Sequence, residues 1–194
     1  GIDVWEVLDA AATKPFGYMP FLPGPGLGGH CIPIDPHYLS WKLKSLNYYA
    51  RFIELAGEIN SSMPTYVTRK VTDALNDVER SVKGSKVLLM GVAYKKDIDD
   101  VRESPALDVA KLLQVKGADV CFHDPFVLEF KLNGETLASQ ELTEELVAGA
   151  DCVVVTTDHS DFDYQMILEK SKIVVDTRNA FGARGIKDDK IVKL

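Results

Sequence analysis

The sequence predicts an α/β fold in which a parallel β-sheet domain, covered by helices on both faces, follows a helical segment. Residues 84–194 alternate continuously apolar runs with helix-like runs, which is typical of strands buried inside a parallel sheet. Residues 1–83 read as helical apart from one Gly/Pro-rich interruption. Because 46% of the 194 residues are hydrophobic and 26% are charged, the chain can bury a substantial core, and disordered and membrane proteins are poor matches.

We therefore divide the chain into a helical domain, residues 1–83, and an α/β domain, residues 84–194. The net charge of −7, without a basic patch, argues against a nucleic-acid partner. The longest apolar runs, 152–155 and 173–175, are too short to cross a membrane, so no membrane partner is expected. The N-terminus is no signal peptide, lacks an initiator Met and reads as helix from its first residue, so we expect part of a longer protein.

The chain has three cysteines, Cys31, Cys121 and Cys152. Their odd number and wide spacing, with no CxxC pair and no nearby histidine in metal-ligand spacing, predict neither a disulfide framework nor a metal site. We expect the protein to reside in the reducing cytoplasm. Cys121 and Cys152 fall in predicted strands and are expected to be small buried core residues. Cys31 differs from these two, because it follows a glycine-rich run and lies outside the predicted strands.

The helical domain is interrupted at residues 17–36, which hold five glycines and five prolines. Apolar residues run through this segment, so we expect an ordered loop and not a linker. Pro36 opens a helix that continues over residues 37–46. A long amphipathic helix follows over residues 48–82, with Pro64 marking a kink or a start. Its apolar stripe needs a cover, either the rest of the chain or a second copy, and we expect a homodimer.

The α/β domain is predicted to contain four strands, over residues 86–91, 118–124, 151–157 and 172–178. Helices are expected over residues 105–116, with Ser104 as N-cap and Pro105 in the first turn, and over residues 142–148 and 164–170. In parallel sheets ligands bind beyond the carboxyl ends of the strands. The residues expected at that edge are Gly91, Asp124, Thr156, Thr157 and Arg178.

Four glycines fall within six residues just before Cys31. Glycines let backbone N–H groups approach a ligand closely, and a thiol beside them can act as a nucleophile. On spacing alone, a tight turn with an incidental cysteine explains the pattern too. We expect His30 and Cys31 to point apart, because adjacent residues of an extended loop do so. The other histidines, His37, His123 and His159, are expected to be packing or surface residues.

Two further segments carry cations where the sheet would hold a phosphate. Residues 91–109 follow the first strand and contain Lys95, Lys96 and Arg102, although they match no standard phosphate-binding motif. Residues 176–181 place Arg178 just past a strand end, where it can meet an anion. Taken singly, each segment is also compatible with a solvated surface loop.

Together and in this order, the three segments resemble the UDP-glucose/GDP-mannose dehydrogenase family. GGHCIPID at 28–35, GVAYKKDIDDVRESP at 91–105 and VVDTR at 174–178 match that family's successive motifs. The resemblance covers essentially the whole chain. It implies a central helical dimerisation segment followed by a Rossmann-like domain for the UDP-sugar. It also implies that the NAD domain, with the family's catalytic Lys and Asn, lies upstream of this sequence.

The resemblance implies an NAD-dependent oxidation of a sugar C6 alcohol to a carboxylate. Cys31 would add to the intermediate aldehyde and give a thiohemiacetal, then a thioester, which water hydrolyses with help from Asp35. By the same resemblance, Arg102 would contact NAD. The residues implied to contact the UDP-sugar are Phe21, Leu22, Gly26, Gly28, Tyr94, Lys95 and Arg178.

The segment around Cys31 departs from the UDP-glucose branch of the family. Ile34 stands where that branch commonly has Lys, and Phe16 lies where it tends to have an Arg. The segment looks more like the branch acting on UDP-N-acetylhexosamines, so we expect UDP-N-acetylglucosamine, with UDP-N-acetylmannosamine and UDP-glucose as alternatives. Surface polysaccharide biosynthesis is the expected pathway.

Two other readings remain for the chain taken by itself. It could be a non-catalytic fragment that binds a UDP-sugar and dimerises, because the cofactor domain is missing. A flavodoxin-like signalling module is disfavoured, since residues 1–83 would then have no role and no acidic cluster follows the first strand.

Overall fold

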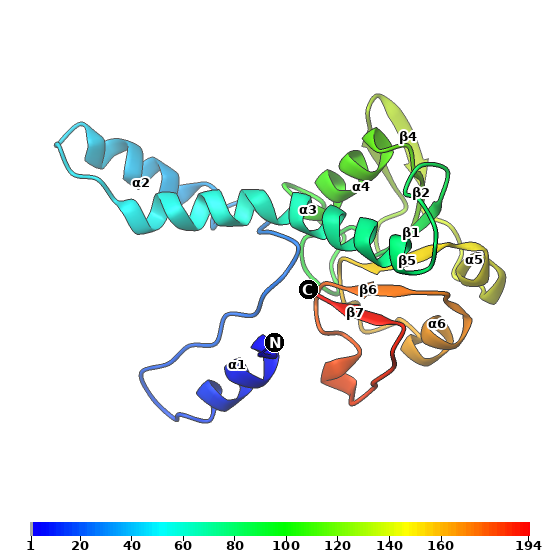
Figure 1. Cartoon of the computed structure of the whole chain (residues 1–194). Helices are drawn as coiled ribbons and strands as arrows, with labels where there is room; N and C mark the ends of the chain where they lie inside the picture. The colour runs from blue at the N-terminus through cyan, green and yellow to red at the C-terminus, as the bar shows by residue number, and fades with distance from the viewer. Residues whose placement is uncertain (1) are drawn as a thin grey trace.

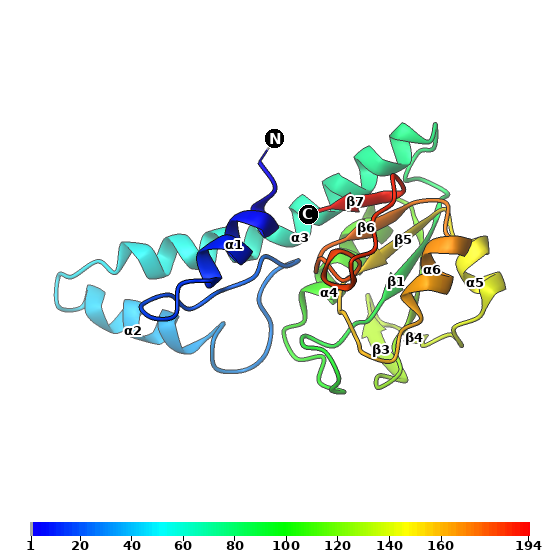
Figure 2. The same cartoon turned by 90° about the horizontal axis from the view of Figure 1, so that it is seen from below.

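The computed structural model describes residues 2–194 and consists of an α/β body from which a helical hairpin projects (Figure 1). The hairpin is formed by α2 (Asp35–Lys44) and the first half of α3 (Arg51–Asp77), and the second half of α3 lies on the body. Figure 2 shows the same projection from below. None of the described helices combines the length and apolar character that crossing a bilayer requires.

The first helix, α1 (Val4–Ala12), begins where Asp3 caps it. The Asp3 carboxylate accepts a hydrogen bond from the Trp5 N–H at 2.9 Å and also pairs with Lys193. The expectation that the chain begins inside a helix is therefore wrong for residues 2–3, and its first residue lies outside the described part of the chain.

The predicted helices of the hairpin are present with shifted ends. Pro36 lies in the first turn of α2, as predicted, because a proline there loses no intrahelical hydrogen bond. Pro64 lies inside the 27-residue α3, so it does not start a helix. α3 ends at Asp77 and not at residue 82, because Glu79 adopts a left-handed conformation. The buried residues of α3 begin at Pro64, so the outer half lacks cover.

The α/β domain is built on a five-stranded parallel sheet of order β2-β1-β5-β6-β7. The four predicted strands are confirmed, and a fifth was missed. The strands are β1 (Lys86–Met90), β2 (Asp119–His123), β5 (Cys152–Val155), β6 (Val174–Asp176) and the unpredicted β7 (Ile191–Lys193). The predicted helices are confirmed as α4 (Pro105–Val115), α5 (Glu144–Gly149) and α6 (Tyr164–Lys170), followed by a short 3-10 turn (Gly182–Arg184).

A second unpredicted feature is the antiparallel hairpin of β3 (Glu129–Leu132) and β4 (Glu135–Ala138). Asn133 and Gly134 connect its strands, both with positive φ, which is the usual requirement of a tight two-residue hairpin turn. The Asn133-Gly134 pair is the sequence feature from which this hairpin could have been predicted.

Both faces of the main sheet are buried, as predicted. On one face, apolar residues of β1 pack with α3 and α4 through side chains such as Leu75, Val109 and Leu113. On the other face, Leu88 and Met90 pack with α5 and α6. Cys121 and Cys152 are buried, which confirms their predicted place in the core.

Candidate functional site

The order in which successive strands join the sheet reverses at β1, so the crossovers from β1 and into β5 leave in opposite directions. From β1 the chain crosses to β2 on one side, and it later returns to β5 on the other side of β1. In open α/β sheets this switch point leaves a crevice at the carboxyl ends of the two strands, where ligands bind. The loop after β1 and the turn after β5, at Thr156 and Thr157, lie at that edge, as predicted.

The glycine-rich loop packs directly on the loop that follows β1. A Cβ added to Gly28 would lie 2.6 Å from Tyr94 Cβ and 2.7 Å from the Glu103 carbonyl oxygen. Gly26 approaches Pro105 in the same way, and the Gly29 N–H donates to the Arg102 carbonyl at 3.1 Å. The glycines are therefore needed because two backbones meet, and they join the Cys31 segment to residues 94–105.

Arg178 joins the same assembly from the end of β6. Its Nε donates to the Thr156 carbonyl at 3.0 Å, and a Cβ on Gly24 would lie 2.6 Å from its Nη1. Asp176 fixes the turn by accepting hydrogen bonds from the backbone N–H groups of Arg178, Ala180 and Phe181. Burial lowers the pKa of the Arg178 guanidinium, while Asp158 opposes that shift. The structure thus brings a partly buried cation between the glycine-rich loop and the turn after β5.

Cys31 is exposed at the start of α2. Its carbonyl accepts hydrogen bonds from the Ile34 N–H at 3.1 Å and the Asp35 N–H at 2.8 Å, so the thiol lies in the turn that begins the helix. The Cys31 Sγ lies 3.9 Å from His30 Nδ1. Our expectation that these two side chains point apart is therefore wrong, because the backbone here is turned and not extended.

Arg102 forms a two-pronged ion pair with Asp100. Its Nε lies 3.0 Å from both carboxylate oxygens and its Nη2 lies 2.6 Å from Oδ2. Hydrogen bonding from Arg102 lowers the pKa of Asp100 to about 2. The pKa of Arg102 is raised, mainly by Asp100 and to a lesser extent by Tyr94 and Cys31. The Arg102 guanidinium is therefore held mainly by Asp100.

The remaining predicted residues stay exposed in the structure. Phe21 is 77% exposed and Leu22 is 64% exposed, and Lys95 also faces solvent. Asp35 opens α2 beside Cys31 and is likewise exposed. Their roles in contacting a sugar, a phosphate or water remain predictions.

A buried polar network at the same edge was not foreseen as functional. His159 is fully buried, with Nε2 lying 3.0 Å from Asp124 Oδ2 and Nδ1 accepting the Asp97 N–H at 2.9 Å. We had assigned His159 only to packing or the surface. The sequence signal was the cluster of polar residues that follows the apolar strand, namely Thr156, Thr157, Asp158 and His159.

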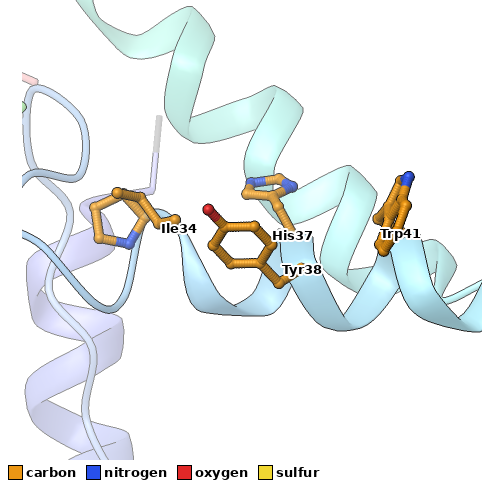
Figure 3. Close-up of a pocket in the computed structure, with 5 residues that line it drawn as sticks. Ile34, His37, Tyr38 and Trp41 are labelled. Carbon is orange, nitrogen blue, oxygen red and sulfur yellow. The ribbon is translucent and has the colours of Figure 1, made fainter.

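An apolar hollow of about 550 Å³ lies along α2, just after the Cys31 turn. In Figure 3, His37 lies between α2 and α3, while the Tyr38 and Trp41 rings stand on α2 and Ile34 precedes them. Pro33 completes its lining. Tyr38 and Trp41 are mostly exposed, so this hollow belongs to the uncovered surface of the hairpin.

Two family models match the chain. One, described as the UDP-glucose/GDP-mannose dehydrogenase family, central domain, matches residues 1–62. The other, described as the UDP binding domain of the same family, matches residues 88–183. Between them they cover the glycine-rich loop, the loop after β1 and Arg178.

Comparison with individual proteins also finds nucleotide-sugar dehydrogenases. A UDP-N-acetyl-D-mannosamine dehydrogenase of Methanococcus maripaludis is 37% identical over 187 residues, which is 92% of this chain and 41% of that protein. The structure of a UDP-D-ManNAc dehydrogenase from Pyrococcus horikoshii covers all of this chain with a TM-score of 0.81 at 29% identity, over 44% of its own length. An NDP-N-acetyl-D-galactosaminuronic acid dehydrogenase from Methanosarcina mazei gives a TM-score of 0.83 at 27% identity, over 44% of its length. The chain thus spans about two fifths of the length of these relatives.

Proposed function

Because this chain belongs to the UDP-glucose/GDP-mannose dehydrogenase family, we propose that it supplies the thiol and the UDP-sugar site of an NAD-dependent UDP-sugar 6-dehydrogenase. The observation that carries this proposal is the docking of the Cys31 loop onto the loop after β1 and onto Arg178. Through that contact, the loop that carries Cys31 touches both the loop after β1 and the partly buried Arg178, which supports a shared site at this edge of the sheet. As an isolated chain, it would bind the UDP-sugar without turning it over.

In this proposal the α/β domain holds the UDP moiety at the switch point of the sheet. Arg178 is pre-positioned by Thr156 and Gly24, so its remaining N–H donors can meet a diphosphate oxygen at little entropic cost. Lys95, on the loop after β1, would supply a second cation. Phe21 and Leu22, with the backbone at Gly26 and Gly28, would face the sugar, and Tyr94 would line the crevice beside them.

Cys31 would carry the second oxidation. Its sulfur adds to the C6 aldehyde and the carbonyl oxygen takes a proton, which gives a thiohemiacetal that can release hydride from C6. Loss of that hydride from C6, together with the hydroxyl proton, gives a thioester. Water activated by Asp35 then attacks C6, the C–S bond breaks, and the carboxylate leaves with the thiol restored. NAD⁺ accepts the hydride in both oxidation steps when it is bound.

Arg102 fits the proposed contact with NAD. Its ion pair with Asp100 uses Nε and Nη2, and the described residues form no hydrogen bond to Nη1. A guanidinium that is oriented in this way and still has free N–H donors can bind a phosphate or an amide of the cofactor. Its side chain is 66% exposed, so an approaching domain can reach it.

The sugar we propose is an N-acetylhexosamine linked to UDP. Ile34 and Phe16 give the Cys31 segment an apolar character that suits an acetamido group better than a hydroxyl. The sequence favoured the glucosamine epimer, whereas the names of the relatives at 37% and 36% identity support the mannosamine alternative. The epimer is therefore a matter for direct comparison of both UDP-sugars.

We propose that a second copy of the chain covers the helical hairpin formed by α2 and the first half of α3. The outer half of α3 exposes 88% of Phe52, and α2 exposes 72% of Trp41. Ser40 and Lys44 of α2 both bind Glu54 of α3, while large apolar side chains of the two helices remain exposed. An apolar surface of this kind is rarely left open to water, and a homodimer would cover it.

Calorimetric titration of the chain with UDP and with both UDP-N-acetylhexosamines tests the proposed site. We expect UDP to bind and the sugar to add affinity, with binding weakened about 100-fold in Arg178→Ala through loss of a charge-assisted contact. Lys187→Ala, which removes an exposed cation elsewhere on the domain, is the matched control and should bind as the unchanged chain does. Equal loss in the two variants, or no UDP binding at all, would contradict the proposed site.

A further inference from the structure

His159 is a buried side chain that the proposed reaction does not use. Its ring is fully buried between Phe126 and Phe162, whose centroids lie 5.1 Å and 5.3 Å from it. The Tyr164 hydroxyl donates to its carbonyl at 3.0 Å, which fixes the backbone of the turn. A polar ring buried in this way is normally retained only if both of its nitrogens are hydrogen-bonded.

One ring nitrogen joins His159 to the end of β2. Nε2 lies 3.0 Å from Asp124 Oδ2, which also accepts the N–H groups of Val92 at 2.7 Å and Ala93 at 3.2 Å. Burial opposes ionisation of Asp124, but hydrogen bonds from His159 and Val92 outweigh it, so its pKa lies below the ordinary value. Asp124 therefore holds the first residues of the loop after β1 and the ring of His159 together.

The other ring nitrogen joins His159 to the middle of the same loop. Nδ1 lies 2.9 Å from the Asp97 backbone nitrogen, which can only donate. Nδ1 is therefore the acceptor, and the ring proton resides on Nε2 and points at Asp124. The Asp97 carboxylate accepts the Ser160 N–H and hydroxyl, each at 2.8 Å, which ties the loop to the turn after β5 a second time.

Lys95 lies between two anchored residues of this loop. On one side Tyr94 packs on Gly28 and Gly29 and donates its N–H to the Asp100 carbonyl at 3.0 Å. On the other side Asp97 is bound to His159 and adopts a left-handed conformation with φ of 61°. Since that conformation is uncommon for an L-residue, the hydrogen bonds around Asp97 are what keep the segment in place.

We propose that His159 is a positioning residue for the UDP-sugar, acting by holding the Lys95 segment against the edge of the sheet through the Asp97 N–H. The proposal rests on the proposed function, because it takes the diphosphate as the ligand of Lys95. The hydrogen bonds from Asp124 to His159 and from His159 to Asp97 would fix the backbone beside Lys95, so that its exposed ammonium group is held at the edge of the sheet.

Two substitutions of His159 separate its two hydrogen bonds. In His159→Asn the amide oxygen can occupy the place of Nδ1 and still accept the Asp97 N–H, while the bond to Asp124 is lost. In His159→Gln the amide nitrogen can occupy the place of Nε2 and still donate to Asp124, while the acceptor for Asp97 is lost. Both remove the same ring from the same cavity, so each is a control for the other's effect on packing.

The test combines amide hydrogen exchange with UDP titration of both variants and of Lys95→Ala. We expect His159→Gln to speed exchange at Asp97 and its neighbours, with the amides of β1 unchanged, and to weaken UDP binding about tenfold, the loss typical of one hydrogen bond. His159→Asn should retain more of both properties. In the Lys95→Ala background, His159→Gln should cost no further affinity.

Three results would overturn the proposal. The first is equal loss in the Asn and Gln variants, which would indicate packing alone. The second is a loosened loop with unchanged UDP affinity. The third is a double variant whose loss of UDP affinity equals the product of the losses caused by His159→Gln and Lys95→Ala alone. If the unchanged chain binds no UDP, the proposed function fails, and the exchange comparison alone decides whether His159 holds the loop.

Discussion

Replacing Gly28 by alanine places a methyl group where two loops already touch. The new Cβ would lie 2.6 Å from Tyr94 Cβ and 2.7 Å from the Glu103 carbonyl oxygen, against an ordinary contact of about 3.5 Å. Neither atom is the mobile end of a side chain, so the glycine-rich loop must move by about 1 Å. Misplacing a reacting group by that distance costs roughly 100-fold in rate.

The assay is turnover of the full-length protein together with amide exchange at Gly29, whose N–H donates to the Arg102 carbonyl. We expect Gly28→Ala to lower kcat about 100-fold and to speed exchange at Gly29. Gly149→Ala is the matched control, because a Cβ there meets nothing within 4 Å. Normal turnover and normal Gly29 exchange in Gly28→Ala would refute the view that this close contact assembles the site.

Three further predictions concern stability, reactivity and pH. Asp124→Ala removes an acceptor of buried N–H groups, so the free energy of unfolding, measured by urea titration, should fall by about 3 kcal/mol; a change within 0.5 kcal/mol of zero, roughly the scatter of surface substitutions, would be inconsistent. Iodoacetamide should modify Cys31 alone in the folded chain, because Cys121 and Cys152 are buried and burial raises the pKa of both thiols; peptide mass spectrometry checks this, and rapid labelling of Cys121 or Cys152 would count against it. Because Arg102 lowers the pKa of Asp100 to about 2, their ion pair should stabilise the folded state at pH values above the unfolded pKa of about 3.9, and this contribution should disappear as pH falls toward 2. A carboxyl NMR titration midpoint near 3.9 would disprove the pairing.

Periodicity was sufficient to predict the elements whose burial is simple. Continuous apolar runs identified the strands β1, β2, β5 and β6, and Ser104 followed by Pro105 located the start of α4. β7 was not predicted because it has only three residues, all of them half-buried, so it lacks the buried apolar run that identified the other strands. The β3–β4 hairpin carried its signal in the Asn133-Gly134 turn.

The candidate site was predictable only where glycines and cations recur in order. The order of the motifs indicated Cys31 and Arg178, but no sequence spacing reveals that Gly24 lies against the Arg178 guanidinium. His159 was undervalued because its partners lie 35 and 62 residues away in the sequence. Long-range hydrogen bonds of this kind depend on the register of the sheet, and periodicity does not encode them.

The most direct test of the central claim is mass spectrometry of the full-length protein after reaction with NAD⁺ and a UDP-N-acetylhexosamine. The account predicts that an adduct with the mass of the UDP-sugar, joined through C6, accumulates on the peptide containing Cys31, more in Asp35→Asn, where hydrolysis of the thioester is slowed. It also predicts that Cys31→Ser forms neither adduct nor uronic acid. Production of uronic acid by Cys31→Ser at the unchanged rate would contradict the claim that this thiol carries the reaction.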